Sequence, residues 1–318
     1  MRFVPYDELR SEPNVIVDGS ATGGTLLTLS HWPKSGTPLE FAADTSAEIV
    51  FKYLDRPSAH VQASAVSNNH FDEDGLIGIF AMVAPATAMR HRELLIASAT
   101  SGDFGVYSSR QAARLAFVIS AFADDATSPL SKEIFTLPYA AQSASLYRTL
   151  LDVIPQVLAD LNAYRRFWEA DDRALTAGEE LIEQGTVAVE ERPDLDLAVI
   201  RIPPNEEMVH VNVLNTRTPC SRLLVIHGQH VELRYRYEGW VQFRSRVVAP
   251  RVDLSPLAVE LNAEEESGGK WEFDGVEAIT PSLHLRGAQA TSLPVDSIVA
   301  RVEHHLRTGR PAWDPFGK

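Results

Sequence analysis

The stretch Val66-Ser-Asn-Asn-His-Phe-Asp-Glu-Asp-Gly-Leu-Ile-Gly-Ile-Phe80 decides how the first half of this chain is expected to fold. The apolar residues 61–66 lead into it and predict a strand that ends in a polar turn. The small and apolar residues after the turn are typical of the start of a buried helix. His70, Asp72 and Asp74 therefore lie on a strand-to-helix connection, where α/β proteins usually place their chemistry.

These three residues supply one imidazole and two carboxylates at alternate positions. Such ligands can converge on one hard divalent cation, manganese or magnesium. A second interpretation is an acidic helix N-terminus, in which Asp72 and Asp74 complement the helix dipole. The alternation of His70 with the two aspartates, followed at once by Gly75, favours the metal site.

The composition indicates a globular protein with a sizeable core. The chain has 318 residues, of which 45% are hydrophobic and 23% are charged, and this length is sufficient for two domains. The first ten residues lack the apolar run of a signal peptide, and no later stretch predicts a membrane span. The single cysteine, Cys220, excludes an internal disulfide and a cysteine-rich zinc site. We therefore expect a cytoplasmic protein that does not bind membranes.

The net charge of −14 argues against an extended nucleic-acid-binding surface, which requires concentrated lysine and arginine. It does not exclude a small phosphorylated substrate. Metal ions and a local group of arginines can reverse the electrostatic field inside one cleft. The global charge therefore bears on solubility more than on chemistry.

Short apolar strands alternate with helical patterns over the first half of the chain. The predicted strands are residues 14–18, 24–30 and 61–66, and residues 110–123 predict a helix. The glycines between the first two strands, from Gly19 to Gly24, predict a hairpin turn. Thr45 opens another helical pattern as an N-cap, and Glu48 completes a capping box. The alternation favours an α/β domain with a mainly parallel sheet over residues 1–170.

The second half has a different character. Leu146 to Trp168 is a helical pattern in which Pro155 predicts a kink or a break, and residues 171–184 form a second, acidic helix that serves as a connector. The predicted β-rich segments that follow are 186–190, 195–202, 208–214, 222–227, 230–237 and 240–248, and helices are predicted at 253–266 and 295–307. We therefore expect residues 171–318 to form a connector helix and a smaller α+β domain that binds substrate.

His70-Phe-Asp72-Glu-Asp74-Gly75 resembles the first motif of the DHH-type phosphoesterase superfamily, in which His-x-Asp-x-Asp precedes Gly or Ala. Residues 96–103 are similar to a later motif of that superfamily, an alanine-rich helix that ends in a metal-binding aspartate. Ser30-His31-Trp32-Pro33 is similar to the signature segment. This segment keeps one of the three Asp-His-His residues and precedes the first motif, as a circularly permuted order would place it.

The resemblance implies a two-domain, metal-dependent hydrolase, usually with manganese, that acts on a phosphoester or phosphoanhydride bond of a nucleotide or small phosphorylated substrate. It implies that His70, Asp72 and Asp74 are catalytic and bind metal together with Asp103 and His31. The altered signature leaves open a degenerate member that binds a nucleotide or a partner without turnover. A metal-dependent hydrolase of a non-phosphate bond is a further alternative. We also expect the whole chain to belong to an uncharacterised bacterial family, a membership that by itself implies no function.

Arginines in the second half suggest where a small anionic substrate would bind. Residues 230–248 predict a hairpin with its turn at Glu238-Gly239, which places Arg234 and Arg236 on one face, with Arg251 nearby in the sequence. One interpretation is a solvated face of the hairpin. The other is that Arg234, Arg236 and Arg251 bind a substrate phosphate or carboxylate, as the second domain does in the superfamily.

Overall fold

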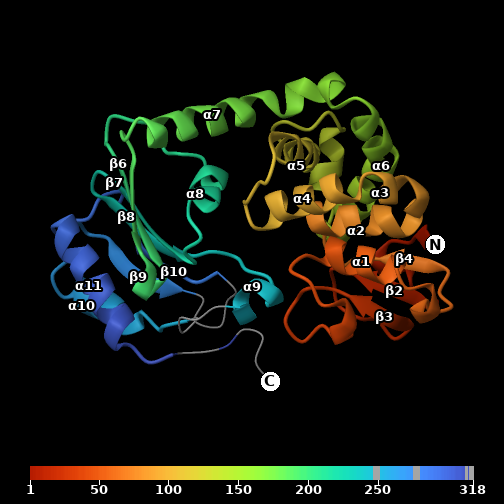
Figure 1. Cartoon of the computed structure of the whole chain (residues 1–318), viewed down its shortest axis with the longest axis horizontal. Coiled ribbons are helices and arrows are strands. Elements are labelled where there is room, and N and C mark those ends of the chain that lie inside the picture. The colour runs from red at the N-terminus through yellow and green to blue at the C-terminus, as the bar shows by residue number, and fades with distance from the viewer. Residues whose placement is uncertain (246–250, 275–279, 312–313, 315–318) are drawn as a thin grey trace. The chain divides into compact units, whose positions relative to one another are not determined.

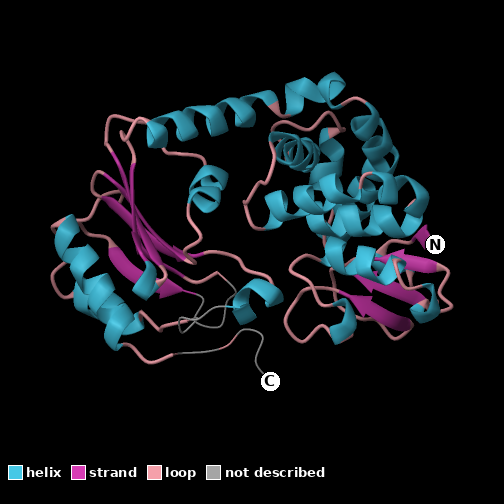
Figure 2. Ribbon diagram, in the orientation of Figure 1, coloured by secondary structure: helices cyan, strands magenta, loops and turns pink. Residues whose placement is uncertain are grey.

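The computed structural model of the protein describes residues 1–245, 251–274, 280–311 and 314, and Figures 1 and 2 show the course of the chain. The chain forms two compact units. The first comprises Met1–Arg173 with Gly239–Val241, and the second comprises Ala174–Glu238 with Gln242–Lys318. None of the described helices combines the length and the apolar character that crossing a membrane requires.

The first unit contains a four-stranded sheet in which every neighbouring pair is parallel. In sheet order its strands are β1 (Arg2–Phe3), β4 (Ala65–Ser67), β2 (Asn14–Val17) and β3 (Thr25–Leu29). Its helices are α1 (Ser46–Leu54), α2 (Glu73–Val83), α3 (Pro85–Arg90), α4 (Arg92–Asp103), α5 (Arg110–Ala123) and α6 (Tyr139–Ala159). The predicted α/β fold with a mainly parallel sheet is confirmed for this part of the chain.

Helices α1 and α2 cover one face of this sheet (Figure 1). Helix α2 buries every residue from Asp74 to Met82, and it lies so close to β2 that a Cβ atom on Gly78 would come within 2.6 Å of a Val17 methyl group. A smaller apolar cluster joins Ile16 of β2 to Val4 and Leu9. Because β2 and β4 are buried along their whole length, the loops at their ends are fixed by the core.

Strands β2 and β3 pair in parallel, with Val15 opposite Leu27 and Val17 opposite Leu29. The hairpin turn predicted from Gly19 to Gly24 is therefore wrong, because residues 18–24 carry the chain back to the other end of the sheet. Glycines mark a change of direction in the chain but do not specify whether the strands that they join are parallel. The parallel pairing puts the carboxyl ends of β2, β3 and β4 at one edge.

Several local predictions are confirmed and others are corrected. Helix α1 begins after Thr45, whose hydroxyl accepts a hydrogen bond from the Glu48 backbone N–H at 3.2 Å, as the capping box predicts. The strand predicted at 61–66 begins only at Ala65. Helix α6 runs through Pro155, so of the predicted kink or break at this residue the break is wrong. A proline removes one helical hydrogen bond, and the burial of Ile154 and Val157 beside it compensates for that loss.

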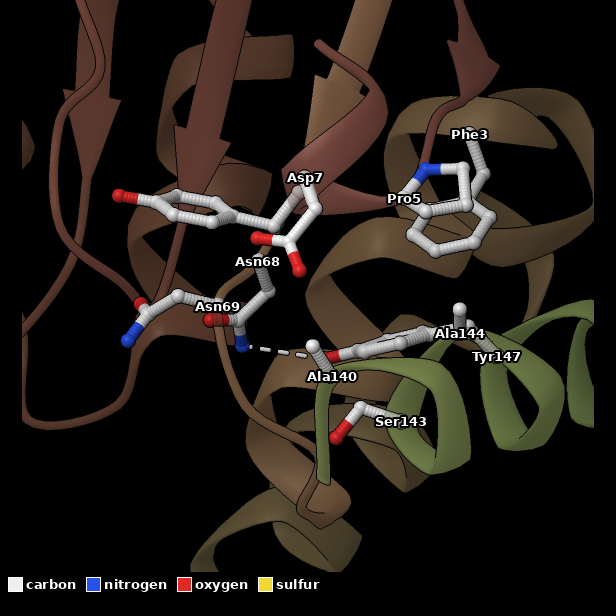
Figure 3. Close-up of a pocket in the computed structure, with 10 residues that line it drawn as sticks. Phe3, Pro5, Asp7, Asn68, Asn69, Ala140, Ser143, Ala144 and Tyr147 are labelled. Carbon is white, nitrogen blue, oxygen red and sulfur yellow. Dashed lines mark hydrogen bonds between the residues drawn. The ribbon is translucent and has the colours of Figure 1, made fainter. Parts of the chain in front are cut away.

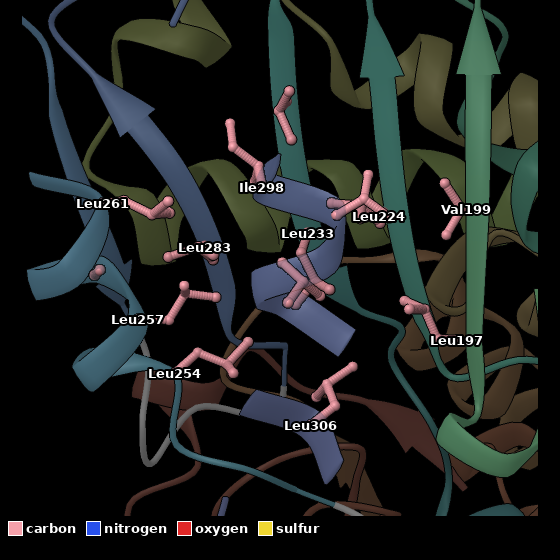
Figure 4. Close-up of a cluster of buried hydrophobic side chains, with 14 of the residues drawn as sticks. Leu197, Val199, Leu224, Leu233, Leu254, Leu257, Leu261, Leu283, Ile298 and Leu306 are labelled. Atoms are coloured by element: carbon pink, nitrogen blue, oxygen red, sulfur yellow. The ribbon is translucent and has the colours of Figure 1, made fainter. Parts of the chain in front are cut away.

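The second unit contains a mixed sheet with the strand order β5-β6-β7-β8-β10-β9. The strands are β5 (Ala188–Arg192), β6 (Leu197–Ile202), β7 (Arg222–His227), β8 (His230–Tyr235), β9 (Lys270–Asp274) and β10 (Ser282–Arg286). The helices are α8 (Val211–Arg217), α10 (Ser255–Asn262) and α11 (Val295–Thr308). Two further helices are divided between the units along the chain, α7 (Glu169–Glu183) after Arg173 and α9 (Trp240–Ser245) after Val241. Leucines and valines of the sheet, α10 and α11 form one apolar core (Figure 4).

Two strand predictions in this half are wrong. The predicted strand 208–214 overlaps helix α8, which buries Val213 and Leu214 together with two asparagines; the alternating valines of this stretch imitate a strand pattern. The predicted strand 240–248 begins as helix α9, and residues 246–248 lie outside the described residues. The hairpin turn predicted at Glu238-Gly239 is therefore wrong as well. The hairpin is instead β7–β8, which turns at Gly228 with φ +58°.

Candidate metal centre

The parallel sheet brings three polar segments together at one edge. Asp18 directly follows β2, His31 follows β3, and His70 follows β4. Asp74 lies in the first turn of α2, and Asp103 is the last residue of α4. Five side chains from four separate segments of the sequence therefore meet, because the strands that precede three of them run in the same direction.

Asp18 lies at the centre of this group and is fully buried. Its Oδ1 accepts hydrogen bonds from Ser46 Oγ at 2.7 Å and from Trp32 Nε1 at 3.1 Å. Its Oδ2 accepts no hydrogen bond of regular geometry in the described part of the chain, and Nε2 of His70 lies 3.1 Å from it. The backbone at Asp18 has φ +52°, a left-handed conformation that costs energy for a residue other than glycine and that occurs often at functional sites. The fold therefore holds the Asp18 carboxylate in place with a backbone conformation that is energetically unfavourable.

The two oxygens of Asp18 face two different histidines. Oδ1 lies 3.4 Å from Nε2 of His31, and Oδ2 lies 3.1 Å from Nε2 of His70. Two groups of potential metal ligands result, one made by Asp18, His70 and Asp72 and the other by Asp18, His31 and Asp74. Within each group the ligand atoms all lie within 4.8 Å of one another. This arrangement suits two cations that share one bridging carboxylate.

His31 is oriented as a ligand by the backbone. Its Nδ1 lies 2.7 Å from the carbonyl oxygen of Asp44. Because a carbonyl only accepts, Nδ1 carries a hydrogen, and Nε2 is the ring nitrogen that faces the carboxylates. Nε2 lies 3.5 Å from Asp103 Oδ2 and 4.0 Å from Asp74 Oδ2. A hydrogen-bonded Nδ1 of this kind is the usual support of a metal-binding histidine.

Asp74 is fixed by the N-terminus of α1. Its Oδ2 accepts the backbone N–H of Ser46 at 2.6 Å and its Oδ1 accepts that of Ala47 at 2.7 Å. Burial, together with the negative charge of Asp18, nevertheless raises the pKa of Asp74 to about 7. Burial and the charge of Asp74 raise the pKa of Asp103 well above its usual range. Asp103 belongs to neither of the two ligand groups, and its Oδ2 lies 3.5 Å from Nε2 of His31.

His70 and Asp72 form a hydrogen-bonded pair. His70 Nε2 lies 2.8 Å from Asp72 Oδ2, and the backbone N–H of Gly75 donates to Asp72 Oδ1 at 2.8 Å. Burial lowers the pKa of His70, but contacts with Asp18 and Asp72 outweigh it and raise that pKa to about 10. Burial and the charge of Asp18 raise the pKa of Asp72. The protonated His70 is thus the cation that balances these carboxylates.

The loop that carries His70 is anchored to helix α6 by a side-chain hydrogen bond. The Asn68 side-chain amide donates to the hydroxyl of the fully buried Tyr147 at 3.0 Å (Figure 3), and its Oδ1 accepts the His70 backbone N–H at 3.3 Å. A Cβ atom on Gly75 would lie 2.4 Å from the Asn68 amide nitrogen. The glycine that ends the motif is therefore required by packing.

The residues present fit a divalent metal. Carboxylate oxygens and imidazole nitrogens are the ligands that manganese and magnesium sites use. Asp18 Oδ2 is a buried acceptor whose neighbouring cation is the protonated His70 at 3.1 Å, and a bound divalent cation would take over that role. The raised pKa values of Asp72, Asp74 and Asp103 record charge repulsion and burial that a cation would relieve. The site therefore has both the ligands and the electrostatic need for metal.

All five metal ligands predicted from the sequence lie in this site: His31, His70, Asp72, Asp74 and Asp103. The central ligand, Asp18, was missed. Asp18-Gly19 has the composition of a turn, but Asp18 also follows an apolar strand directly, as the other polar segments do. A polar residue directly after an apolar strand was therefore the feature of the sequence that could have indicated Asp18.

The arginines predicted to bind substrate lie in the second unit, where their described contacts are structural. Arg236 donates to the backbone carbonyls of Thr218 at 2.7 Å and Cys220 at 3.2 Å. Arg251 is 1% exposed and lies over the Tyr235 ring at 4.9 Å. Arg234 is a half-buried residue of β8. Their role in binding an anionic substrate stays a prediction.

Comparison with known proteins gives a family but no function. No curated protein sequence and no solved structure matches the chain significantly, and nothing in these comparisons links it to the DHH-type phosphoesterases. One family, described only as a family of unknown function, matches residues 1–316. Because this match spans almost the whole sequence, the chain belongs to the family of unknown function DUF6687.

Proposed function

We propose that the protein is a metal-dependent hydrolase that cleaves a phosphoester or phosphoanhydride bond of a nucleotide or small phosphorylated substrate. The observation that carries this proposal is the Asp18 carboxylate, which faces His31 with one oxygen and His70 with the other. Asp18, His70 and Asp72 would hold one divalent cation, and Asp18, His31 and Asp74 the second. Manganese is the favoured metal and magnesium the alternative.

Bound divalent cations would lower the pKa of a bound water and stabilise negative charge on phosphoryl oxygens. The chain itself orients the ligands. The Asp44 carbonyl holds the His31 ring, two backbone N–H groups of α1 hold Asp74, and the Gly75 N–H holds Asp72. All of these contacts are made by backbone groups, so the ligand positions are set before any metal binds.

The proposal is tested by activity in the presence of added manganese. The purified protein should hydrolyse bis(p-nitrophenyl) phosphate or inorganic pyrophosphate with manganese, and hydrolysis should stop in EDTA and return when manganese is restored. Asp18→Asn should remove the activity while keeping the fold. Hydrolysis at the same rate in EDTA, or in Asp18→Asn, would contradict the proposal.

A second candidate function is supported by Trp32. An indole cannot bind a metal as a histidine does, and Trp32 stands where the DHH-type signature has its last histidine, donating instead to Asp18. This supports a degenerate protein that binds metal and an anionic ligand without turnover. Manganese binding with no hydrolysis of any phosphate ester or anhydride would favour this candidate, and hydrolysis of a non-phosphate ester alone would favour a different metal-dependent hydrolase.

A further inference from the structure

A cavity of about 640 Å³ lies beside the candidate metal centre. Its wall is made by residues 19–21, 32–35 and 69–70, so that it shares His70 with the metal centre. This volume is in the range of sites that bind small organic molecules. Besides His70, the wall contains one lysine, Lys34, and one large aromatic side chain, Trp32. These two residues define what the cavity can bind.

Trp32 presents a fixed aromatic surface. Its indole N–H donates to Asp18 at 3.1 Å, and its ring stands at 77° to the His70 ring with 5.7 Å between the ring centres. The side chain is nevertheless 43% exposed. An exposed tryptophan that is already held in one orientation can pack against a planar ring with little further loss of conformational entropy.

Lys34 occupies a position that a lysine normally avoids. The Ser35 N–H donates to the Trp32 carbonyl at 3.2 Å, which closes a four-residue turn with Pro33 in its second position. Lys34 follows with φ +62°, where turns of this kind favour glycine or asparagine. Non-glycine residues in this conformation cluster at functional sites, which supports a functional role for the Lys34 side chain.

Lys34 also lacks a carboxylate partner in the part of the chain that the structure describes. The other three described lysines, Lys52, Lys132 and Lys270, each lie within 4.0 Å of a carboxylate. The chain carries a net charge of −14, so an exposed lysine beside an acidic centre would readily find one. Lys34 instead remains available to an anionic ligand at the cavity.

We propose that this cavity binds the organic part of an anionic substrate, a phosphate ester that carries a planar ring. The ring would pack on Trp32, and Lys34 would contact an oxygen of the phosphate or of a second anionic group. This inference rests on the proposed function for the position of the reacting phosphate. It adds two specificity-determining residues, neither of which is a metal ligand.

The test is calorimetric titration of the full chain, saturated with manganese, with phenyl phosphate and with inorganic phosphate. The matched variants are Lys34→Asn and Lys132→Asn, which each remove one positive charge from the same unit. Lys34→Asn should weaken the binding of both anions about fivefold, a loss that salt reduces, and should not lower the melting temperature, because asparagine suits a positive φ. Lys132→Asn and the manganese affinity of both variants should not change.

The role of Trp32 is tested through the ratio of the affinities for phenyl phosphate and inorganic phosphate. A ratio is used because Trp32 contacts Asp18, so its replacement can also affect the binding of both anions. The wild-type protein should bind phenyl phosphate more tightly than inorganic phosphate, Trp32→Ala should lose this preference, and Trp32→Phe should keep most of it. Equal anion affinities in wild type and Lys34→Asn, or an unchanged preference in Trp32→Ala, would overturn the inference even if manganese-dependent hydrolysis is found. Lys34-dependent binding without hydrolysis would support the inference and refute only the proposed catalysis.

Discussion

Replacing Asp18 by asparagine perturbs both ligand groups with one change of nearly constant shape. The asparagine oxygen can still accept from Ser46 and Trp32, which now donate to Oδ1. The amide nitrogen would take the place of Oδ2, 3.1 Å from Nε2 of His70, and His70 keeps its other contact, with Asp72. Folding should therefore persist, while the one carboxylate common to both groups is lost.

The expected magnitude follows from mass action. Loss of a supporting partner of a metal ligand weakens metal affinity about 10- to 100-fold, so loss of the shared ligand itself should weaken it by about 100-fold or more. Manganese at about 100 times the wild-type Kd stabilises the folded state by about 2.7 kcal/mol. At roughly 2–4 °C per kcal/mol for a unit of this size, the melting temperature should rise by about 5–11 °C. The same concentration should stabilise Asp18→Asn by about 0.4 kcal/mol, or about 1 °C.

The assay is a thermal melt of each protein in EDTA and in manganese, with calorimetric titration for the affinity. Asp103→Asn is the matched control, since Asp103 is also an acidic residue near His31 but belongs to neither ligand group. It should blunt the rise only in part. A manganese-induced rise in Asp18→Asn equal to that of the wild type would refute the assignment of Asp18 as the shared ligand.

The remaining predictions concern the motif, the pH dependence and the packing of α2. The double variant Asp72→Asn, Asp74→Asn should bind manganese far more weakly by calorimetry while its circular dichroism stays native; unchanged affinity would remove the motif from the site. The free energy of unfolding of the metal-free protein should fall as the pH rises. The pKa of Asp74 is raised from 3.8 to about 7 and that of His70 from 6.5 to about 10. Across these two pH intervals the folded state holds protons that the unfolded state releases. Urea unfolding in EDTA at pH 5 and 8.5 measures this, and Asp74→Asn should show a smaller loss. Gly78→Ala should lower the free energy of unfolding by about 1–3 kcal/mol, because its Cβ atom would lie 2.6 Å from a β2 side chain. Gly23→Ala is the control and should change this free energy little, because its Cβ atom would have no atom within 4 Å. Equal effects of the two variants would mean that α2 can shift.

The proposed metal-binding motif could be recognised in the sequence because its candidate ligands are close together in the chain. His70, Asp72 and Asp74 lie within one turn, so local spacing alone brings them together. The contribution of Asp18 depends on β2 and β4 pairing side by side in parallel, a long-range fact that local patterns do not contain. Its left-handed backbone and the glycine after it imitate an ordinary turn.

The errors in the second half have a related cause. The alternating valines before and within α8 match the period of a strand. In the structure, however, this segment is helical, and tertiary packing buries Val213 and Leu214 on the helix. The sequence pattern placed Arg234 and Arg236 on one face of a hairpin that turns at Glu238-Gly239, whereas the chain turns at Gly228. Arg236 then meets backbone carbonyls, a contact that only the folded sheet defines.

The central claim is that Asp18 bridges two metal positions, and crystals soaked in manganese test it most directly. Anomalous scattering should give one peak coordinated by Asp18, His70 and Asp72 and a second coordinated by Asp18, His31 and Asp74. Both oxygens of Asp18 should be bonded to metal, at the roughly 2.0–2.6 Å expected for divalent cations on carboxylates. Manganese peaks that leave Asp18 uncoordinated, or no peak at this edge of the sheet at saturating manganese, would contradict the account.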